Sequence, residues 1–285
     1  MKIIFVCTGN TCRSPFAEGY FNSLKIKDIV AESRGLSIGG MKVSENSEII
    51  AKEYGFSIDS HLSKTFREED FGADYIFTMS ENHKDFLVKN GGNREKIFVL
   101  GSGIPDPFGG DLEVYRFSLQ KIAEEIDKLY FGGFFDKIRI TDMTSEDISF
   151  IAKTEKENFS EPWSETSITE SSKSNTSFFV AKTDNEPLGY VGLNFVLDEG
   201  YITSIAVNSN HRNKGIATKL INKCISFARE NNLAFVSLEV RESNQNAINL
   251  YDKLGFKKEG LRKNFYRMPT ENAIIMTRRL NTKKC

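Results

Sequence analysis

Short apolar runs alternate with amphipathic segments in the first half of the chain. The runs have the length and composition of buried strands, and they lie at Ile3–Val6, Tyr75–Met79 and Ile97–Leu100. Apolar residues at helical spacing predict a helix whose face is made by Leu119, Ile122, Ile126 and Leu129. Strands that alternate with helices favour an α/β fold with a parallel sheet and a site beyond the carboxyl ends of its strands.

Longer strands mark the second half. Two of them are predicted at Leu188–Val196 and Gly200–Val207, and a further strand is expected to end at Asn244. The helix between them has an apolar face made by Ile216, Leu220, Cys224 and Phe227. This half therefore also combines strands and helices, with a different rhythm.

A glycine pair separates the two patterns. The helical run ends at Gly132–Gly133, and a new strand is expected at Lys137–Ile140. We therefore expect two domains, residues 1–133 and 137–280, and the length of 285 residues favours the same number.

Composition and charge favour a globular protein over a membrane-spanning or nucleic-acid-binding one. A hydrophobic content of 39% with a mean hydropathy of −0.36 is ordinary for a globular chain, and no apolar run approaches the roughly 18 residues of a membrane span. The formal charge is −5 for residues 1–136 and +4 for residues 137–285. The positive excess lies in the tail, at Arg278, Arg279, Lys283 and Lys284. We therefore expect neither a nucleic-acid partner nor a membrane partner.

Cysteine and histidine spacing gives no sign of a metal. Three histidines are scattered, and the four cysteines lack the spacing of a zinc site or of a secreted disulfide framework; they are Cys7, Cys12, Cys224 and Cys285. Because Met1 and Lys2 lead straight into a short predicted strand, we expect no signal peptide. We expect a reducing cytoplasm and no metal cofactor.

Residues 6–15, with the sequence VCTGNTCRSP, hold the clearest chemistry. They connect the first strand to a helix that Pro15 opens, so that Cys7 and a row of backbone N–H groups face the positive end of the helix. That field stabilises a thiolate, and the Arg13 guanidinium can bind a phosphate through two nitrogens. The alternative is a buried structural cysteine before a Gly-Asn turn.

This stretch resembles the signature of the low-molecular-weight protein phosphatases. The resemblance implies in-line attack of Cys7 on phosphorus, a cysteinyl-phosphate, and equatorial oxygens held by Arg13 and the loop amides. Ser14 would hydrogen-bond to the thiolate, and Asn10 would brace the loop. The phosphate-binding residues it implies are Thr8, Gly9, Asn10, Thr11, Cys12 and Ser14.

The same family needs a general acid on a distant loop, and residues 104–110 (IPDPFGG) look like that loop. Asp106 would protonate the leaving group and then activate the water that hydrolyses the intermediate. An Asp-Pro pair alone indicates only a turn.

Two details bear on the phosphorylated substrate. Thr11 and the Asp-Pro-Phe-Gly-Gly sequence resemble the protein-arginine-phosphatase branch, and only Phe108 could form an aromatic wall. We therefore favour phosphoarginine over phosphotyrosine on the protein substrate. Cys12 is either a disulfide partner for an oxidised Cys7 or a small packing residue.

The second half offers another anion cradle. Between a strand and a helix, Gly215 and Ala217 let the backbone approach a pyrophosphate at the helix N-terminus. A tight strand-to-helix turn would explain the same residues. Downstream, Glu239 lies near the end of a strand, and Tyr251 lies on a short helix that Gly255 caps. Taken singly, they could be a solvated charge and a packing aromatic.

Together these residues resemble the Gcn5-related N-acetyltransferases, and most closely the bacterial ribosomal-protein-alanine N-acetyltransferases. The resemblance runs from Ile138 to about Leu280, and includes residues 161–164 (EPWS) and 264–266 (NFY). It implies an α/β domain with a mixed sheet, acetyl-CoA as co-substrate and a ribosomal-protein N-terminus as acceptor. Other protein N-termini or lysines remain open as acceptors.

The resemblance also implies a role for individual residues. Glu239 would act as general base on the incoming ammonium, and Tyr251 as general acid to the departing thiolate. The backbone of one strand would pair with the pantetheine arm, at Ile205, Ala206 and Val207. The remaining contacts to the co-substrate would come from Asn213, Lys214, Gly215, Ile216, Ala217, Thr218 and Asn244.

The sequence thus predicts a bifunctional enzyme that joins a cysteine-dependent phosphatase to an acetyltransferase. The rival hypothesis is a binding module in which one half has lost turnover. A short segment before Asp106 favours that rival, and the presence of every expected catalytic residue type in both halves opposes it.

Overall fold

The computed structural model describes residues 1–37, 39–184 and 186–280. Lys283, Lys284 and Cys285 lie outside the described residues. The chain separates into two compact units, Met1–Lys128 and the residues from Leu129 onward. Both units combine a sheet with helices, which confirms the α/β prediction.

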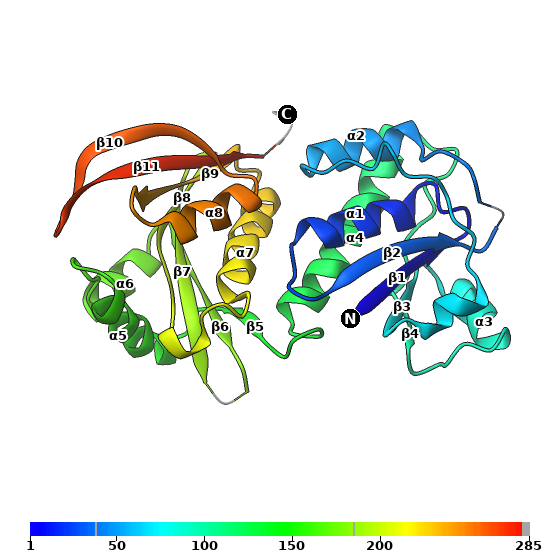
Figure 1. Ribbon diagram of the computed structural model, residues 1–285, viewed down its shortest axis with the longest axis horizontal. Coiled ribbons are helices and arrows are strands. Elements are labelled where there is room, and N and C mark those ends of the chain that lie inside the picture. Colours follow the sequence, from blue (N-terminus) through cyan, green and yellow to red (C-terminus); the bar gives the residue numbers. More distant parts are fainter. Residues whose placement is uncertain (38, 185, 281–285) are drawn as a thin grey trace. The chain divides into compact units, whose positions relative to one another are not determined.

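The first unit contains a four-stranded sheet in the order β2-β1-β3-β4, and every pair of neighbours is parallel (Figure 1). The strands are β1 (Lys2–Cys7), β2 (Val30–Gly35), β3 (Tyr75–Thr78) and β4 (Ile97–Val99). The sequence analysis missed β2, because its buried side chains are those of Ala31 and Ser33, with Gly35 at its end. Such small residues leave no apolar run to detect.

Four helices complete the first unit: α1 (Arg13–Ser23), α2 (Glu45–Glu53), α3 (Glu81–Lys89) and α4 (Leu112–Phe131). Helix α1 packs on β1 and β2, and α3 packs on β3 and β4. The Phe5 ring lies 6.0 Å from the ring of Phe21 and 5.8 Å from that of Phe77. Since β1 ends at Cys7 and α1 begins at Arg13, this core holds both ends of the loop between them.

The second unit contains a seven-stranded mixed sheet in the order β10-β11-β9-β8-β7-β6-β5. Only β8 and β9 are parallel neighbours, as the predicted mixed sheet requires. The strands are β5 (Arg139–Asp142), β6 (Thr176–Lys182), β7 (Pro187–Val196), β8 (Glu199–Val207), β9 (Phe235–Arg241), β10 (Lys257–Arg267) and β11 (Thr270–Arg279).

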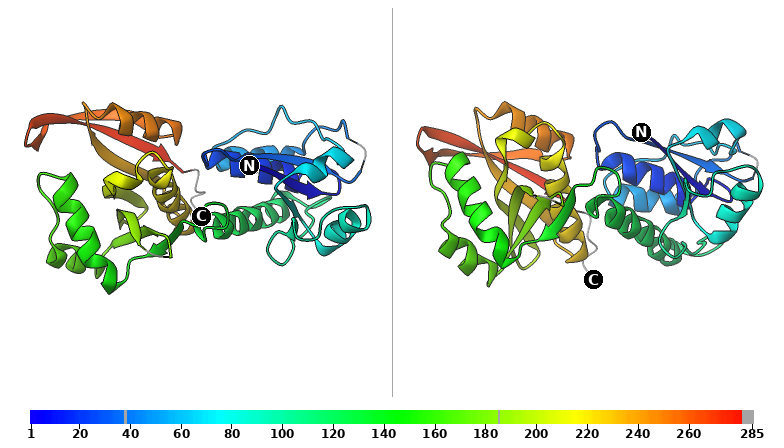
Figure 2. Two further views of the ribbon diagram at one scale, coloured as in Figure 1. Left: turned by 60° about the horizontal axis from the view of Figure 1, so that its bottom comes forward. Right: turned by 90° about the horizontal axis from the view of Figure 1, so that it is seen from below.

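Helices lie on both faces of this sheet (Figures 1 and 2). They are α5 (Ile148–Asn158), α6 (Glu165–Ser172), α7 (Ile216–Glu230) and α8 (Gln245–Lys253). Phe178 of β6 packs with the core residues of α5 and α6, and the ring of the next residue, Phe179, packs edge-on against that of Phe227 of α7. Neighbouring residues of one strand point to opposite faces, so this pair places α5 and α6 across the sheet from α7.

Two predicted boundaries were wrong by a few residues. Strand β5 begins at Arg139 rather than Lys137, and β9 ends at Arg241 rather than Asn244. Asn244 instead caps α8, where its side-chain oxygen accepts the N–H of Ala247 at 3.2 Å. Within the described ranges, no helix combines the length and apolar character that crossing a bilayer requires.

Candidate active sites

The loop between β1 and α1 wraps around the Cys7 thiol. The backbone N–H of Asn10 points at the Cys7 sulfur at 3.2 Å, and the Ser14 hydroxyl lies 3.0 Å from that sulfur. The N-terminus of α1 has no side-chain cap and no acidic residue in its first turn, so its positive end is open to an anion. The structure therefore brings Cys7, Asn10 and Ser14 together.

Asn10 braces the loop through both ends of its side chain. Its backbone is left-handed, with φ of 52°, a conformation that asparagine tolerates better than most residues. Its amide nitrogen donates to the hydroxyls of Ser14 and Ser33 at 2.9 and 2.8 Å. Its amide oxygen accepts from the Lys64 backbone N–H at 2.7 Å and from His61 Nε2 at 3.1 Å. This network holds the curve of the loop in the absence of a ligand.

Arg13 and Asp106 meet in space although 93 residues separate them. An Arg13 nitrogen lies 2.5 Å from an Asp106 oxygen, and a second Arg13 nitrogen donates to the Ile104 carbonyl at 3.1 Å. The Arg13 side chain is buried, whereas that of Asp106 is half exposed. The Ser118 hydroxyl on α4 holds the acid loop through the Pro105 carbonyl at 2.8 Å. A carboxyl thus faces the mouth of the loop, as a general acid must.

Two further residues of the loop contact each other at its far side. The Thr11 hydroxyl lies 3.6 Å from the Cys12 sulfur, which in turn lies 3.4 Å from the Tyr115 hydroxyl. Cys7 and Cys12 are both free thiols, so a disulfide between them stays a prediction. Phe108 is 82% exposed, so its ring is available to a ligand at the entrance.

The sequence analysis did not predict that two histidines, His61 and His83, contact this loop. His61 supports Asn10, and burial lowers its pKa below 6.5 despite the opposing charge of Glu18. His83 lies 2.9 Å from the Thr8 hydroxyl, and burial, followed by the Arg13 charge, lowers its pKa as well. Both reach the loop from distant segments, so no local spacing could reveal them.

The second unit offers an anion site at the N-terminus of α7. Gly215 immediately precedes the helix with φ of +83°, and the helix has no side-chain cap. Asn213 and Lys214 are exposed beside it, and Ala217 and Thr218 are half-buried in the first turn. Uncapped N–H groups next to a glycine fit a pyrophosphate, because no side chain obstructs the backbone.

The sheet opens next to this helix. Strand β8 pairs with β9 only from Glu199 to Ile202, whereas its other edge pairs with β7 as far as Val207. The edge of residues 203–207 that faces β9 is therefore without a strand partner in the described part of the chain. An extended pantetheine arm fits such an edge, because it can pair with backbone groups as a strand does. The predicted residues Ile205, Ala206 and Val207 form this edge.

Glu239 lies in a cluster of charged and aromatic side chains. Arg262 donates to its carboxylate at 2.8 Å, and the Tyr266 hydroxyl donates to its backbone carbonyl at 3.2 Å. Tyr201 donates to Glu199, and the charges of Glu199 and Glu239 both raise the pKa of Tyr201, after its hydrogen bond and burial. Two carboxylates near one tyrosine form a suitable surface for an ammonium group.

Tyr251 is buried on α8. Burial raises the pKa of its phenol, and the neighbouring Tyr266 acts in the same direction. The phenol therefore stays protonated at neutral pH, as a general acid requires. Since Tyr266 also contacts Glu239, it links the predicted acid and base within one unit.

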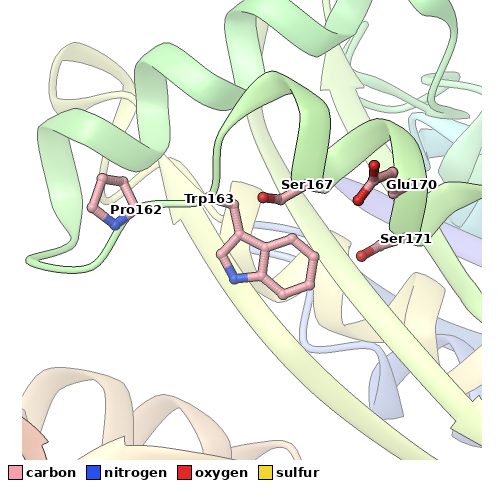
Figure 3. A pocket seen from close by; sticks show the side chains of 5 residues that line it. All are labelled: Pro162, Trp163, Ser167, Glu170 and Ser171. Atoms are coloured by element: carbon pink, nitrogen blue, oxygen red, sulfur yellow. The ribbon is translucent and has the colours of Figure 1, made fainter.

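A small pocket lies beside α6 (Figure 3). Its volume is about 280 Å³, and it is lined by Pro162, Trp163, Ser167, Glu170 and Ser171. Glu155 holds the backbone N–H of Trp163 at 3.2 Å and accepts a hydrogen bond from Tyr190. Glu155 thus fixes the backbone of Trp163 at the edge of this pocket. Among the described residues, no three His, Cys, Asp or Glu side chains gather where they could hold a metal ion.

Two family models match the two units. The model of the low molecular weight phosphotyrosine protein phosphatases matches residues 2–139, and that of the acetyltransferase (GNAT) family matches residues 146–256. The GNAT fold implies the use of acetyl-CoA, and the open edge of β8 with the uncapped α7 suits it. This co-substrate supplies an acetyl thioester that an amine can attack.

Known proteins resemble one unit or the other. The low molecular weight protein-tyrosine-phosphatase PtpB of Staphylococcus epidermidis is 40% identical over 138 residues, which are 46% of this chain and 98% of that protein. The YwlE arginine phosphatase of Geobacillus stearothermophilus is 33% identical with a TM-score of 0.43, over 45% of this chain and 89% of its own. The ribosomal-protein-S18-alanine N-acetyltransferase of Escherichia coli is 28% identical with a TM-score of 0.47, over 50% of this chain and 94% of its own. The chain therefore belongs to the low-molecular-weight protein phosphatase family in its first unit and carries a GNAT acetyltransferase domain in its second.

Proposed function

We propose that the chain is a bifunctional enzyme of the reducing cytoplasm that removes phosphate from phosphoarginine in proteins and acetylates a protein N-terminus. The observation that carries the first activity is the convergence of four groups at one loop. The Asn10 N–H faces the Cys7 sulfur, and the Arg13 guanidinium lies against Asp106. Nucleophile, oxyanion donor, phosphate clamp and acid are then within one site.

The reaction follows from those positions. The Cys7 thiolate attacks phosphorus and forms an S–P bond, while Asp106 gives its proton to the departing nitrogen or oxygen as the P–N or P–O bond breaks. Asp106, now a carboxylate, takes a proton from the water that attacks the cysteinyl-phosphate. The S–P bond then breaks, and inorganic phosphate and the free Cys7 thiolate are released. Arg13 and the loop N–H groups hold the equatorial oxygens throughout.

Thr11 and the exposed Phe108 support phosphoarginine as the substrate. The Thr11 hydroxyl is a polar group in a loop where an aliphatic side chain would favour an aryl phosphate, and Gly109 and Gly110 add no second aromatic wall. Phosphotyrosine is the second candidate, because PtpB of S. epidermidis is a protein-tyrosine-phosphatase by name.

Phosphate release from phosphoarginine and phosphotyrosine peptides, compared side by side, tests the first activity. We expect faster release from phosphoarginine, abolished in Cys7→Ser. Thr11→Ile should shift the preference toward phosphotyrosine. Faster turnover of phosphotyrosine by the wild type would assign the site to the tyrosine branch, and binding of phosphopeptides without turnover would support a docking module.

For the second activity we propose that the acceptor is the N-terminal alanine of a ribosomal protein. The cluster of Glu199, Tyr201 and Glu239 supports an ammonium acceptor, with Glu239 as base and Tyr251 as acid. Acetylation of peptides that begin with alanine, measured against peptides with only an internal lysine, tests the choice. Equal or faster acetylation of the lysine peptides would overturn it, and Glu239→Gln should remove the activity toward either.

A further inference from the structure

Three side chains, those of Ser80, His83 and Thr8, form a hydrogen-bonded series that connects the start of α3 to the phosphatase loop. Ser80 caps this helix, and its hydroxyl lies 3.0 Å from His83 Nδ1. His83 Nε2 lies 2.9 Å from the hydroxyl of Thr8, the residue that follows Cys7. His83 is 9% exposed, whereas Thr8 is exposed. The hydrogen-bonded series thus passes from the half-buried Ser80 through the buried His83 ring to the exposed Thr8.

The donors and acceptors in this series can be assigned in order. The Ser80 oxygen already accepts the backbone N–H of His83 at 3.3 Å, so its own hydrogen is free to point at Nδ1. A ring nitrogen that accepts leaves the other nitrogen protonated in the neutral imidazole, so Nε2 donates to Thr8. The Thr8 oxygen is then an acceptor toward His83, and its hydrogen must point elsewhere. No other partner for this hydroxyl occurs among the described residues.

The charged groups around His83 place its ring beside the catalytic residues. The ring is close enough to Arg13 and Asp106 for both charges to act on it, so it lies at the same mouth. The burial that lowers the pKa of His83 keeps the ring neutral at physiological pH. We propose that His83 is a positioning residue that turns the Thr8 hydroxyl toward a phosphoryl oxygen of the bound substrate. Thr8 then adds a side-chain donor to those of Arg13 and the loop amides.

The inference rests on the proposed phosphatase reaction, and variants of the full-length chain test it. Thr8→Val should lower kcat/KM for a phosphorylated peptide about 10-fold, the effect of one hydrogen bond to a charged group, while Thr8→Ser keeps the rate. His83→Leu should cause a similar loss. His83→Gln should recover part of the rate, because its amide N–H can replace Nε2–H.

The decisive comparison is the double variant Thr8→Val/His83→Leu. If His83 acts only through Thr8, the double variant is no slower than Thr8→Val alone. Multiplied losses would assign His83 a separate structural role and overturn the proposal, as would an unchanged rate in Thr8→Val. Thermal unfolding of the first unit, compared with that of the wild type, checks that the first unit of each variant is folded. A wild type without Cys7-dependent turnover would instead overturn the proposed function.

The histidine ring provides a readout that does not depend on turnover. Nitrogen-15 spectra of the wild type should show His83 as the neutral tautomer with its proton on Nε2. Thr8→Val should move that resonance, because the ring loses its acceptor. A proton on Nδ1 would reverse the direction of both hydrogen bonds. The Thr8 hydroxyl would then donate to His83 Nε2, and the proposal would be overturned.

Discussion

At the scale of single residues, the first site depends on polar side chains that each make several contacts. Asn10 combines a left-handed backbone with four side-chain hydrogen bonds, two as donor and two as acceptor. Few residues can satisfy both demands, because most side chains destabilise a positive φ and cannot donate and accept at once. The conformation of the loop therefore depends mainly on one residue, Asn10.

Asn10→Ala should destabilise the first unit by about 2 kcal/mol and lower phosphate release at least about 10-fold, since it loses the hydrogen bonds and strains the backbone. Thermal unfolding and phosphate release measure the two effects. Asn10→Gly is the matched control, because it removes the same side chain without the strain. Equal stability of the two variants would show that strain contributes nothing.

Arg262 forms an ion pair with Glu239, the predicted general base of the second site. Its ion pair with Glu239 is partly exposed, so it contributes less than about 1 kcal/mol and can be displaced by an ammonium. Arg262→Ala should lower the KM for an acceptor peptide by up to about five-fold, with an unchanged KM for acetyl-CoA. Steady-state kinetics measure both constants. Arg279→Ala, which removes an exposed pair with Glu259, is the matched control and should change neither.

At the scale of elements, both sites lie in a connection between a strand and the following helix. Strand β1 leads into α1, and β8 leads through a short turn into α7. Each helix begins without a side-chain cap, so its first N–H groups are available to an anion. Both connections are formed by residues that are contiguous in the chain, and for that reason the sequence alone could suggest them as anion sites.

Gly215→Ala should raise the KM for acetyl-CoA several-fold and destabilise the second unit by about 1–2 kcal/mol, because φ is +83° at the cradle. Gly255→Ala is the matched control, since Gly255 has nearly the same φ of +84° at the end of α8. We expect a similar loss of stability there with an unchanged KM for acetyl-CoA. A raised KM in both variants would mean that strain, and not the cradle, is responsible.

Contiguous motifs can be found in a sequence, whereas contacts between distant segments cannot. Cys7, Arg13 and Gly215 belong to such motifs: Cys7 ends β1, Arg13 begins α1 and Gly215 immediately precedes α7. His61 and His83 reach the loop from segments more than 50 residues away, and nothing around them marks that contact. Strand β2 was missed for the related reason that its buried residues are small or polar.

At the scale of the whole molecule, acid should affect the two units over different ranges of pH. Burial lowers the pKa of His61 and His83 below 6.5 in the folded first unit, so the unfolded chain binds their protons first as the pH falls. Their contribution to stability is complete above about pH 6.5 and is lost toward the folded-state pKa values. In the second unit burial raises the pKa of Asp147, but Lys182 and the hydrogen bonds from Thr144 together outweigh it, and the net pKa falls below 3.8. That contribution declines only in stronger acid.

Thermal unfolding between pH 7.5 and 5 should therefore show a falling midpoint for the first unit. His83→Gln removes one of the two titrating groups and should flatten the slope. Phosphatase and acetyltransferase activities after heating assign each transition to its unit. An identical slope in wild type and variant would show that His83 does not contribute.

The open edge of β8 has a consequence for the exchange of backbone hydrogens. Among the residues that the structure describes, the amide groups of residues 203–207 that face β9 have no strand partner, so their hydrogens should exchange with deuterium faster than those that pair with β7. A co-substrate that pairs with this edge completes the sheet and should slow exchange at these few positions. Hydrogen exchange at these residues therefore shows whether the co-substrate is bound, without a measurement of acetyl transfer.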